Sequence, residues 1–98
     1  MAKFTVSEPA TSDVEGILAY LISKYANDAA RRIDLELYAA YERLSAFPFS
    51  GAKVRIKRFS HYRFVIVEKY YIFYTFKDNL ITIERVLHTA RNYKAILK

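Results

Sequence analysis

The chain has 98 residues, enough for one domain, and 53% of them are hydrophobic, which is ample for a core and argues against intrinsic disorder. The absence of Cys excludes disulfides and thiolate metal sites, and no apolar run approaches the ~20 residues of a membrane span. Sixteen Lys and Arg against ten Asp and Glu give a net charge of +6, which favours a polyanionic partner such as nucleic acid, a ribosome or an acidic protein segment; charge that only keeps a protein monodisperse would give the same total.

The chain opens with a strand that leads into a helix. Residues 3–7 alternate, with Phe4 and Val6 on one face. Ser7 is a favourable N-cap, and Pro9 fits the first turn of the helix that follows. Gly16 is unfavourable inside this helix, and we expect it to mark close packing. Apolar residues repeat at helical spacing and form one stripe: Val14, Ile17, Leu18, Leu21, Ile22 and Tyr25.

A second helix is expected over residues 28–47, capped by Asn27. About three residues join the two helices, so they run antiparallel as a hairpin. Pro48 ends the second helix, and residues 48–51 form a turn. Its inner stripe is Ala30, Ile33, Leu37, Ala40, Tyr41 and Leu44.

After this turn the apolar period changes from helical to alternating, which predicts strands. Residues 54–59 alternate apolar and basic side chains, and residues 62–67 continue as a strand. Residues 70–76 are a nearly continuous apolar and aromatic run typical of a central strand, and 80–87 form another, with Ile81 and Ile83 on one face and Val86 on the other. The connections at 68–69 and 77–79 are short enough for hairpins, and the tail from 90 to 98 is either a short helix or an extended arm.

The predicted order is therefore β-α-α-β-β-β. Helices come first and strands last, which indicates an α+β fold in which a helical hairpin packs on one face of a mainly antiparallel sheet. No repeat, linker or low-complexity segment interrupts this single domain over residues 1–98.

Ordinary catalytic equipment is scarce, and the main candidate surface is basic and aromatic. The spacing of His and carboxylates predicts no metal site, and no glycine-rich loop indicates a nucleotide cofactor. His88 is the best candidate for proton transfer, although a lone His after a strand is more often structural. Arginines can bind phosphates, and together they can stabilise a phosphoryl transition state without a metal. The candidates for this surface are Lys53, Arg55, Lys57, Arg58 and Arg63, followed by Arg85, Arg91 and Tyr93; an ordinary solvated strand face explains the first group about equally well.

Taken in order, several segments resemble the RelE/ParE superfamily of toxins from type II toxin–antitoxin systems. The segments are Phe4-Thr5-Val6-Ser7, the helix ending Ile17-Leu18-Ala19-Tyr20, the break Leu44…Phe47-Pro48…Gly51, the strand Tyr71-Ile72-Phe73-Tyr74 and the strand Ile81 to His88 with Arg91 behind it. The ending Arg85-Val86-Leu87-His88 is the most specific of them. The resemblance covers nearly the whole chain.

The resemblance implies a cytoplasmic toxin, which agrees with the lack of a signal-peptide core in the first ten residues. It also implies a cognate antitoxin encoded beside the toxin, and it implies one of two targets. Some members of the superfamily cleave mRNA in the ribosomal A site, whereas ParE-like members poison DNA gyrase.

One departure bears on the target. The ribosome-dependent nucleases usually carry an Arg in the central strand, and the matching position here is Tyr71. That change removes a cation expected at the scissile phosphate, so the ParE-like function is favoured. His88 nevertheless matches a position where some nucleases have a catalytic His, and Arg63 or Arg91 could supply the missing charge.

Three hypotheses follow. A gyrase inhibitor would act by binding alone, through Arg85, His88, Arg91 and Tyr93. A metal-independent endoribonuclease would use Lys53, Arg55, Arg63, His88 and Arg91. A decayed toxin would only bind its antitoxin and help to repress their operon.

Overall fold

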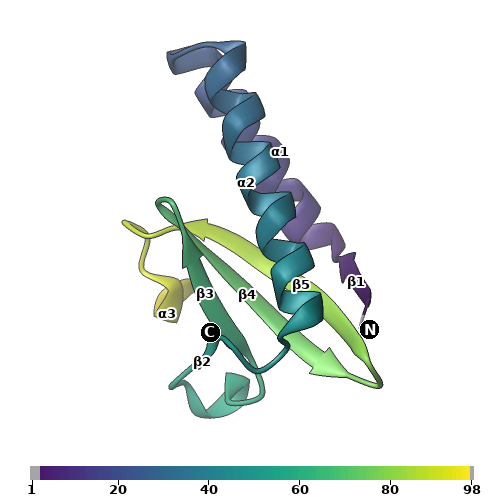
Figure 1. The fold of residues 1–98 in the computed structure, drawn as a ribbon. Coiled ribbons are helices and arrows are strands. Elements are labelled where there is room, and N and C mark those ends of the chain that lie inside the picture. The colour runs from purple at the N-terminus through teal and green to yellow at the C-terminus, as the bar shows by residue number, and fades with distance from the viewer. Residues whose placement is uncertain (1–2, 98) are drawn as a thin grey trace.

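The computed structural model describes residues 3–97, and the chain folds as a two-helix hairpin against a five-stranded sheet (Figure 1). The strand order is β1-β5-β4-β3-β2, in which β1 lies parallel to β5 and all other neighbours are antiparallel. The predicted α+β fold is confirmed. The elements are β1 (Lys3–Val6), α1 (Glu8–Lys24), α2 (Asn27–Ala46), β2 (Ala52–Lys53), the 3₁₀ turn η1 (Lys57–Phe59), β3 (Arg63–Val67), β4 (Tyr70–Lys77), β5 (Leu80–His88) and α3 (Tyr93–Ile96).

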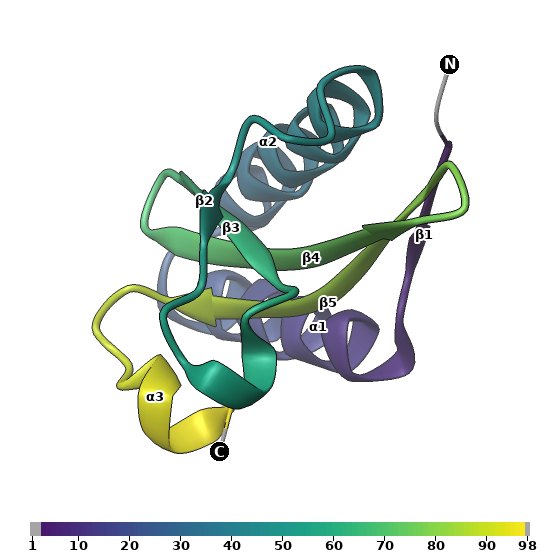
Figure 2. The ribbon, with the colours of Figure 1, turned by 90° about the horizontal axis from the view of Figure 1, so that it is seen from below.

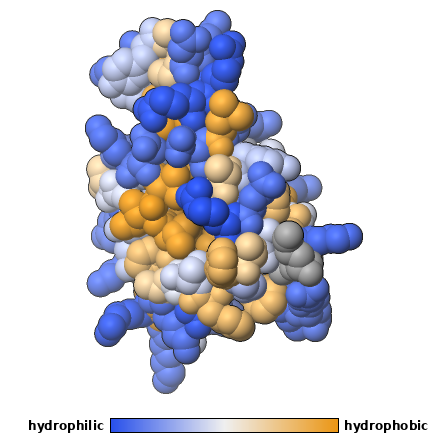
Figure 3. All heavy atoms as spheres, viewed as in Figure 1, coloured by the Kyte–Doolittle hydropathy of each residue, from blue (hydrophilic) through white to orange (hydrophobic). Residues whose placement is uncertain are grey.

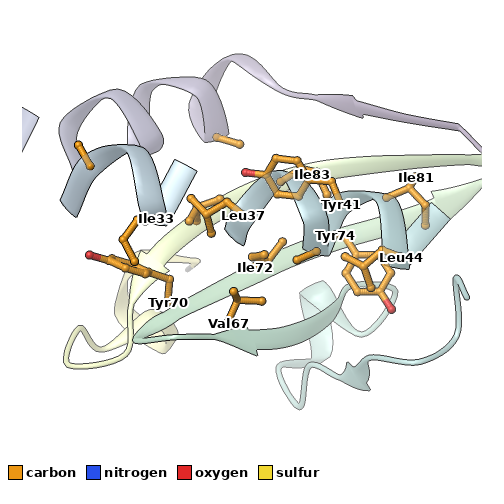
Figure 4. Packing of buried hydrophobic residues seen from close by; sticks show 14 of the residues in the cluster. Ile33, Leu37, Tyr41, Leu44, Val67, Tyr70, Ile72, Tyr74, Ile81 and Ile83 are labelled. Atoms are coloured by element: carbon orange, nitrogen blue, oxygen red, sulfur yellow. The ribbon is translucent and has the colours of Figure 1, made fainter. Parts of the chain in front are cut away.

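The main core lies between the hairpin and one face of the sheet. All six apolar residues predicted for the inner stripe of α2 are buried, and they lie over side chains from β3, β4 and β5 (Figure 4). Tyr74 is fully buried, donates its hydroxyl to the carbonyl of Pro48 at 2.8 Å and accepts from the N–H of Gly51 at 2.9 Å. These two bonds fix the turn after α2 to the centre of the sheet.

Two local expectations about the helices are wrong. Asn27 is the first residue of α2 rather than its cap, since Ala26 holds the N-cap position and no side chain caps this end. Gly16 does not mark close packing, because nothing lies within 4 Å of where its Cβ would be. By contrast, Ser7 caps α1 as predicted, with its side chain accepting from Ala10 N–H at 3.2 Å.

Residues 54–59 do not form the predicted strand. Pairing with β3 covers only Ala52 and Lys53, and the chain then turns away into η1, with Phe59 N–H donating to the carbonyl of Ile56 at 2.8 Å. The alternation was real but had another cause. Val54 is buried and Ile56 half-buried because they cover the second face of the sheet, while Arg55 and Lys57, which alternate with them, face solvent.

The face assignment within β5 is wrong after Ile83. The register jumps from Tyr74↔Ile83 to Phe73↔Arg85, so Glu84 is an extra residue, a β-bulge. The bulge reverses the alternation, and Val86 joins Ile81 and Ile83 in the main core instead of facing away.

A second, smaller core covers the opposite face of the sheet. The tail forms the short helix α3, so the helix is the correct one of the two predicted forms up to residue 97; Lys98 lies outside the described residues. α3 and the β2–η1 segment lie side by side on this face (Figure 2). The buried members of this core are Val54, Phe73, Leu87 and Leu97.

The hairpin is longer than the sheet beneath it, and its tip projects past the strands (Figure 1). The stripe of α1 therefore has no partner at its far end, where Tyr25 is 65% exposed and Ile22 50% exposed. A separate hydrophobic area lies beside α2 (Figure 3), where a depression of about 260 Å³ includes Leu44, Phe47 and Ile66 in its lining. Among residues 3–97, no helix is long and apolar enough to cross a membrane.

Candidate functional site

A groove of about 840 Å³ lies where the projecting hairpin passes over the ends of β4 and β5. Its walls are mainly apolar and aromatic: Ile17, Tyr20, Leu21 and Tyr25 come from α1, Ile33 from α2, and Tyr70, Val86 and Leu87 from the sheet. Gly16 also lines the groove, and because it has no side chain, nothing projects from α1 into the groove at this position. Burial raises the pKa of Tyr70, and the hydroxyls of Tyr20 and Tyr25 nearby raise it further. A groove of this size and composition can accept apolar side chains from a partner.

An ion pair joins α1 to the bulge of β5 beside the groove, and its carboxylate, Asp13, is part of the groove lining. Arg85 donates from Nε and Nη2 to the two carboxylate oxygens of Asp13, at 2.7 and 2.9 Å. The same carboxylate accepts from Val86 N–H at 3.0 Å, and Ser7 Oγ donates to the carbonyl of Glu84 at 3.0 Å. These contacts satisfy the edge of β5 beyond Ile83, where pairing with β1 ends. The hydrogen bond to Asp13 raises the pKa of Arg85, so this guanidinium is a structural cation.

A second ion pair spans the opposite end of the groove. Arg32 of α2 donates to Glu68 in the β3–β4 turn at 2.7 Å, and this bond raises the pKa of Arg32. Both side chains are largely exposed, so the pair contributes little stability but neutralises the carboxylate. Asp13 and Glu68 are the two carboxylates in the lining, and both are paired. The remaining charged groups are Lys69 and Arg91, which give the rim a positive character.

His88 lies in this groove at the end of β5. Its Nδ1 accepts from Ala90 N–H at 3.0 Å, and its carbonyl accepts from Arg91 N–H at 2.9 Å. Its ring packs edge-on to Tyr70 with centroids 5.5 Å apart. Because Nδ1 is an acceptor, the neutral imidazole carries its proton on Nε2. The structure thus brings His88 and Arg91 together at one end of the groove.

Arg63 lies elsewhere. It pairs with Tyr74, whereas His88 pairs with Tyr70, so four residues of β4, ~13 Å, separate their backbone positions. The guanidinium of Arg63 donates to the carbonyl of Gly51 at 2.7 Å and lies over the ring of Phe49 at 5.2 Å. It holds the turn after α2, so the three residues predicted as catalytic are not gathered in one place.

The remaining predicted residues divide in the same way. Lys53, Arg55, Lys57 and Arg58 are exposed along β2, η1 and the loop between them, away from the groove. Tyr93 is half-buried, and its ring packs against those of Tyr71 and Phe73 at 5.1 and 5.2 Å. Among the described residues, no three His, Asp or Glu side chains are grouped as a metal site would require.

Comparison with known proteins settles the family. Residues 4–93 match the family described as the ParE toxin of type II toxin–antitoxin system, parDE. The chain belongs to this family. No curated protein matches it at the level of sequence.

Solved structures agree on the fold. A chain from the chromosomal ParDE toxin–antitoxin system of P. aeruginosa has a TM-score of 0.75 at 15% identity, over 90% of this chain and 95% of that one. A conserved hypothetical protein from Helicobacter pylori has a TM-score of 0.60 at 15% identity, over 93% and 98%. The RelE/ParE resemblance inferred from sequence is therefore confirmed.

The resemblance to this family implied a hydrophobic groove for the antitoxin, but the sequence did not show which residues line it. The signal was present, because the apolar stripe of α1 runs on to Tyr25, one turn beyond Leu21, the last buried residue of that helix. Nothing in the sequence fixes the length of the sheet beneath the hairpin, so the projection could not be foreseen. The structural tasks of Arg63 and Arg85 were hidden for a similar reason, since Arg85 and Asp13 are 72 positions apart.

Proposed function

We propose that this toxin acts by binding DNA gyrase and that a cognate antitoxin neutralises it. The observation that carries the proposal is the separation of the candidate catalytic groups. Arg63 is bound to backbone carbonyls in the turn after α2, about four residues along the sheet from His88, so the groove brings only His88 and Arg91 of this set together. Tyr71, which occupies the position of the expected nuclease arginine, is packed against Tyr93 and Phe64. This arrangement favours a binding surface over a phosphoryl-transfer site.

The test uses purified gyrase, supercoiled plasmid and ATP. Adding the toxin should accumulate linear plasmid that detergent and protease reveal, as expected when a covalent gyrase–DNA intermediate is trapped. The variant Arg91→Ala should weaken trapping, since Arg91 is exposed in the predicted target surface, whereas Lys24→Ala on α1 should not. Unchanged supercoiling activity at all toxin concentrations would refute the gyrase target.

We assign the antitoxin to the groove. Its apolar walls and unpaired Lys69 and Arg91 suit an acidic segment with apolar anchors that becomes ordered on binding. Replacing Tyr20 and Tyr25 by Ser should weaken antitoxin binding at least tenfold, because both rings would lose contact area. Leu35→Ser is the matched control, since Leu35 is 64% exposed on α2 and outside the groove lining. Equal affinities for both variants would place the antitoxin elsewhere.

One observation keeps a second function in view. His88 and Arg91 lie together in the groove, and a proton-transfer group beside a cation is the minimum for cleaving a phosphodiester bond. A ribosome-dependent endoribonuclease would lose mRNA cleavage on His88→Ala while keeping its fold and its antitoxin. Cleavage of mRNA on purified ribosomes by the unaltered toxin would favour this function over gyrase inhibition.

A further inference from the structure

The charges of this chain are segregated. The helices α1 and α2 carry seven carboxylates and four cations, whereas residues 43–67 and 85–97 contain no Asp or Glu at all. The net charge of +6 therefore understates the positive charge on one side of the molecule. An uneven distribution of this kind creates a directed electrostatic field, which a total charge alone does not.

The two acid-free segments meet in space. The β2–η1 segment and α3 pack together through the second core, on the face of the sheet opposite the main core with the hairpin (Figure 2). Within residues 3–97, Arg85 is the only cation of the two acid-free segments that forms an ion pair, and its partner is Asp13. Six exposed cations lie in this layer or at its border, and we call them the cationic cap: Lys53, Arg55, Lys57, Arg58, Lys94 and, where the layer borders the groove, Arg91.

The Phe and Tyr rings of this layer are turned inward, whereas the imidazole of His61 is exposed. Phe59, Tyr62 and Tyr93 pack against the second core and are only partly exposed. Proteins that hold single-stranded nucleic acid need open rings on which bases stack, and these rings are occupied. The cap therefore offers much charge but no open Phe or Tyr ring, which suits an intact double helix contacted through its phosphates.

We propose that the cationic cap binds the phosphate backbone of duplex DNA, independently of sequence. The exposed side chains Lys57 and Arg58 project from a turn of 3₁₀ helix, and Arg91 and Lys94 come from the neighbouring tail. The acidic helical layer would face away from the duplex, which orients the toxin on it. The choice of DNA over duplex RNA rests on the proposed gyrase function, whereas backbone binding itself does not.

The experiment measures binding of the purified toxin to a short labelled DNA duplex by fluorescence anisotropy over a series of salt concentrations. If the cap contacts four to six phosphates, affinity should fall roughly 100- to 2,000-fold between about 50 and 200 mM salt. Duplexes of unrelated sequence should bind equally, and single-stranded DNA should bind more weakly.

Two triple variants with the same change in net charge locate the contact. Arg55→Gln, Lys57→Gln and Lys94→Gln together should lower affinity at least tenfold and reduce the logarithmic salt slope by about 2.7. Lys3→Gln, Lys24→Gln and Arg31→Gln remove three exposed cations outside the cap and should change affinity less than threefold. Thermal unfolding of both variants checks that the fold is retained.

Equal losses in the two variants would overturn the proposal, because the attraction would then come from overall charge. Tighter binding of single strands or of duplex RNA would also overturn it. The test of DNA binding by the cap can be distinguished from the test of gyrase as the target. A toxin that traps gyrase on DNA but does not bind free duplex leaves the proposed function standing and removes this inference, and binding without trapping does the reverse.

Discussion

At the scale of single residues, the tasks of the charged side chains follow from their partners and not from their types. Arg63 and Arg85 stand in a basic, strand-rich sequence like the cations of the cap, yet both are held by acceptors within the fold. Asp13 accepts three hydrogen bonds, two from Arg85 and one from the N–H of Val86, and its side chain is only 14% exposed. A carboxylate with so many donors is expected to matter for stability.

We expect Asp13→Asn to lower the free energy of unfolding by about 2 kcal/mol, because an amide cannot accept from Arg85 at both oxygens and leaves a partly buried cation unpaired. Asp28→Asn is the matched control, since Asp28 pairs with Arg31 at 3.4 Å and its side chain is 92% exposed. That variant should lose less than ~0.5 kcal/mol. Urea unfolding measures the stability of both variants. Similar losses of stability would show that the ion pair between Asp13 and Arg85 does not support the fold.

A second residue-level prediction concerns alkaline pH. Burial, reinforced by Asp34, raises the pKa of Tyr41 from 10 to about 12. The unfolded chain therefore releases this proton first, so the stability from the neutral phenol is complete below pH 10 and is lost as the pH rises toward 12. Tyr41→Phe removes the titrating group, and its stability should fall less between these pH values, by on the order of 1 kcal/mol. Parallel curves for the two proteins in urea unfolding would contradict this.

At the scale of elements, the sequence predicted those features that depend on local pattern. The α2 stripe, the break at Pro48 and the turn at Asp78–Asn79, where both residues have positive φ, were all readable. The β5 bulge was not, because an inserted residue leaves no local signature and shows only in the pairing with β4. Residues 54–59 failed differently: alternation also arises when a loop buries every second side chain, as Val54 and Ile56 do.

The two glycines make a paired test of what each element tolerates. At Gly51 an added Cβ would lie 2.6 Å from the Tyr74 hydroxyl and 2.8 Å from the Phe64 carbonyl, both fixed groups. Gly51→Ala should therefore destabilise the fold by about 2 kcal/mol or more. Gly16→Ala meets open space inside α1 and should stabilise it by about 0.5–1 kcal/mol. Thermal melts give both values, and a neutral Gly51→Ala would mean that the turn is free to move.

At the scale of the whole molecule, a fold of this size has a limited core, and part of its apolar surface remains in the groove. A partner that binds only the folded chain stabilises it by mass action. We expect the antitoxin complex to melt roughly 10 °C or more above the free toxin, with a gain that decreases as salt screens Lys69 and Arg91. Calorimetry of the free toxin and the complex measures the difference, and equal melting temperatures would count against the groove as the binding site.

The most direct test of the central claim is to induce the toxin alone in a bacterial host that carries a plasmid, and to examine the DNA after detergent lysis. Action on gyrase predicts that linear plasmid with covalently attached protein accumulates as growth stops, and that co-expressing the antitoxin prevents both effects. Growth arrest with intact plasmid and cleaved mRNA would contradict the claim and move the function to His88 and Arg91. Unimpaired growth would contradict it as well, and would indicate a toxin that no longer acts on its host.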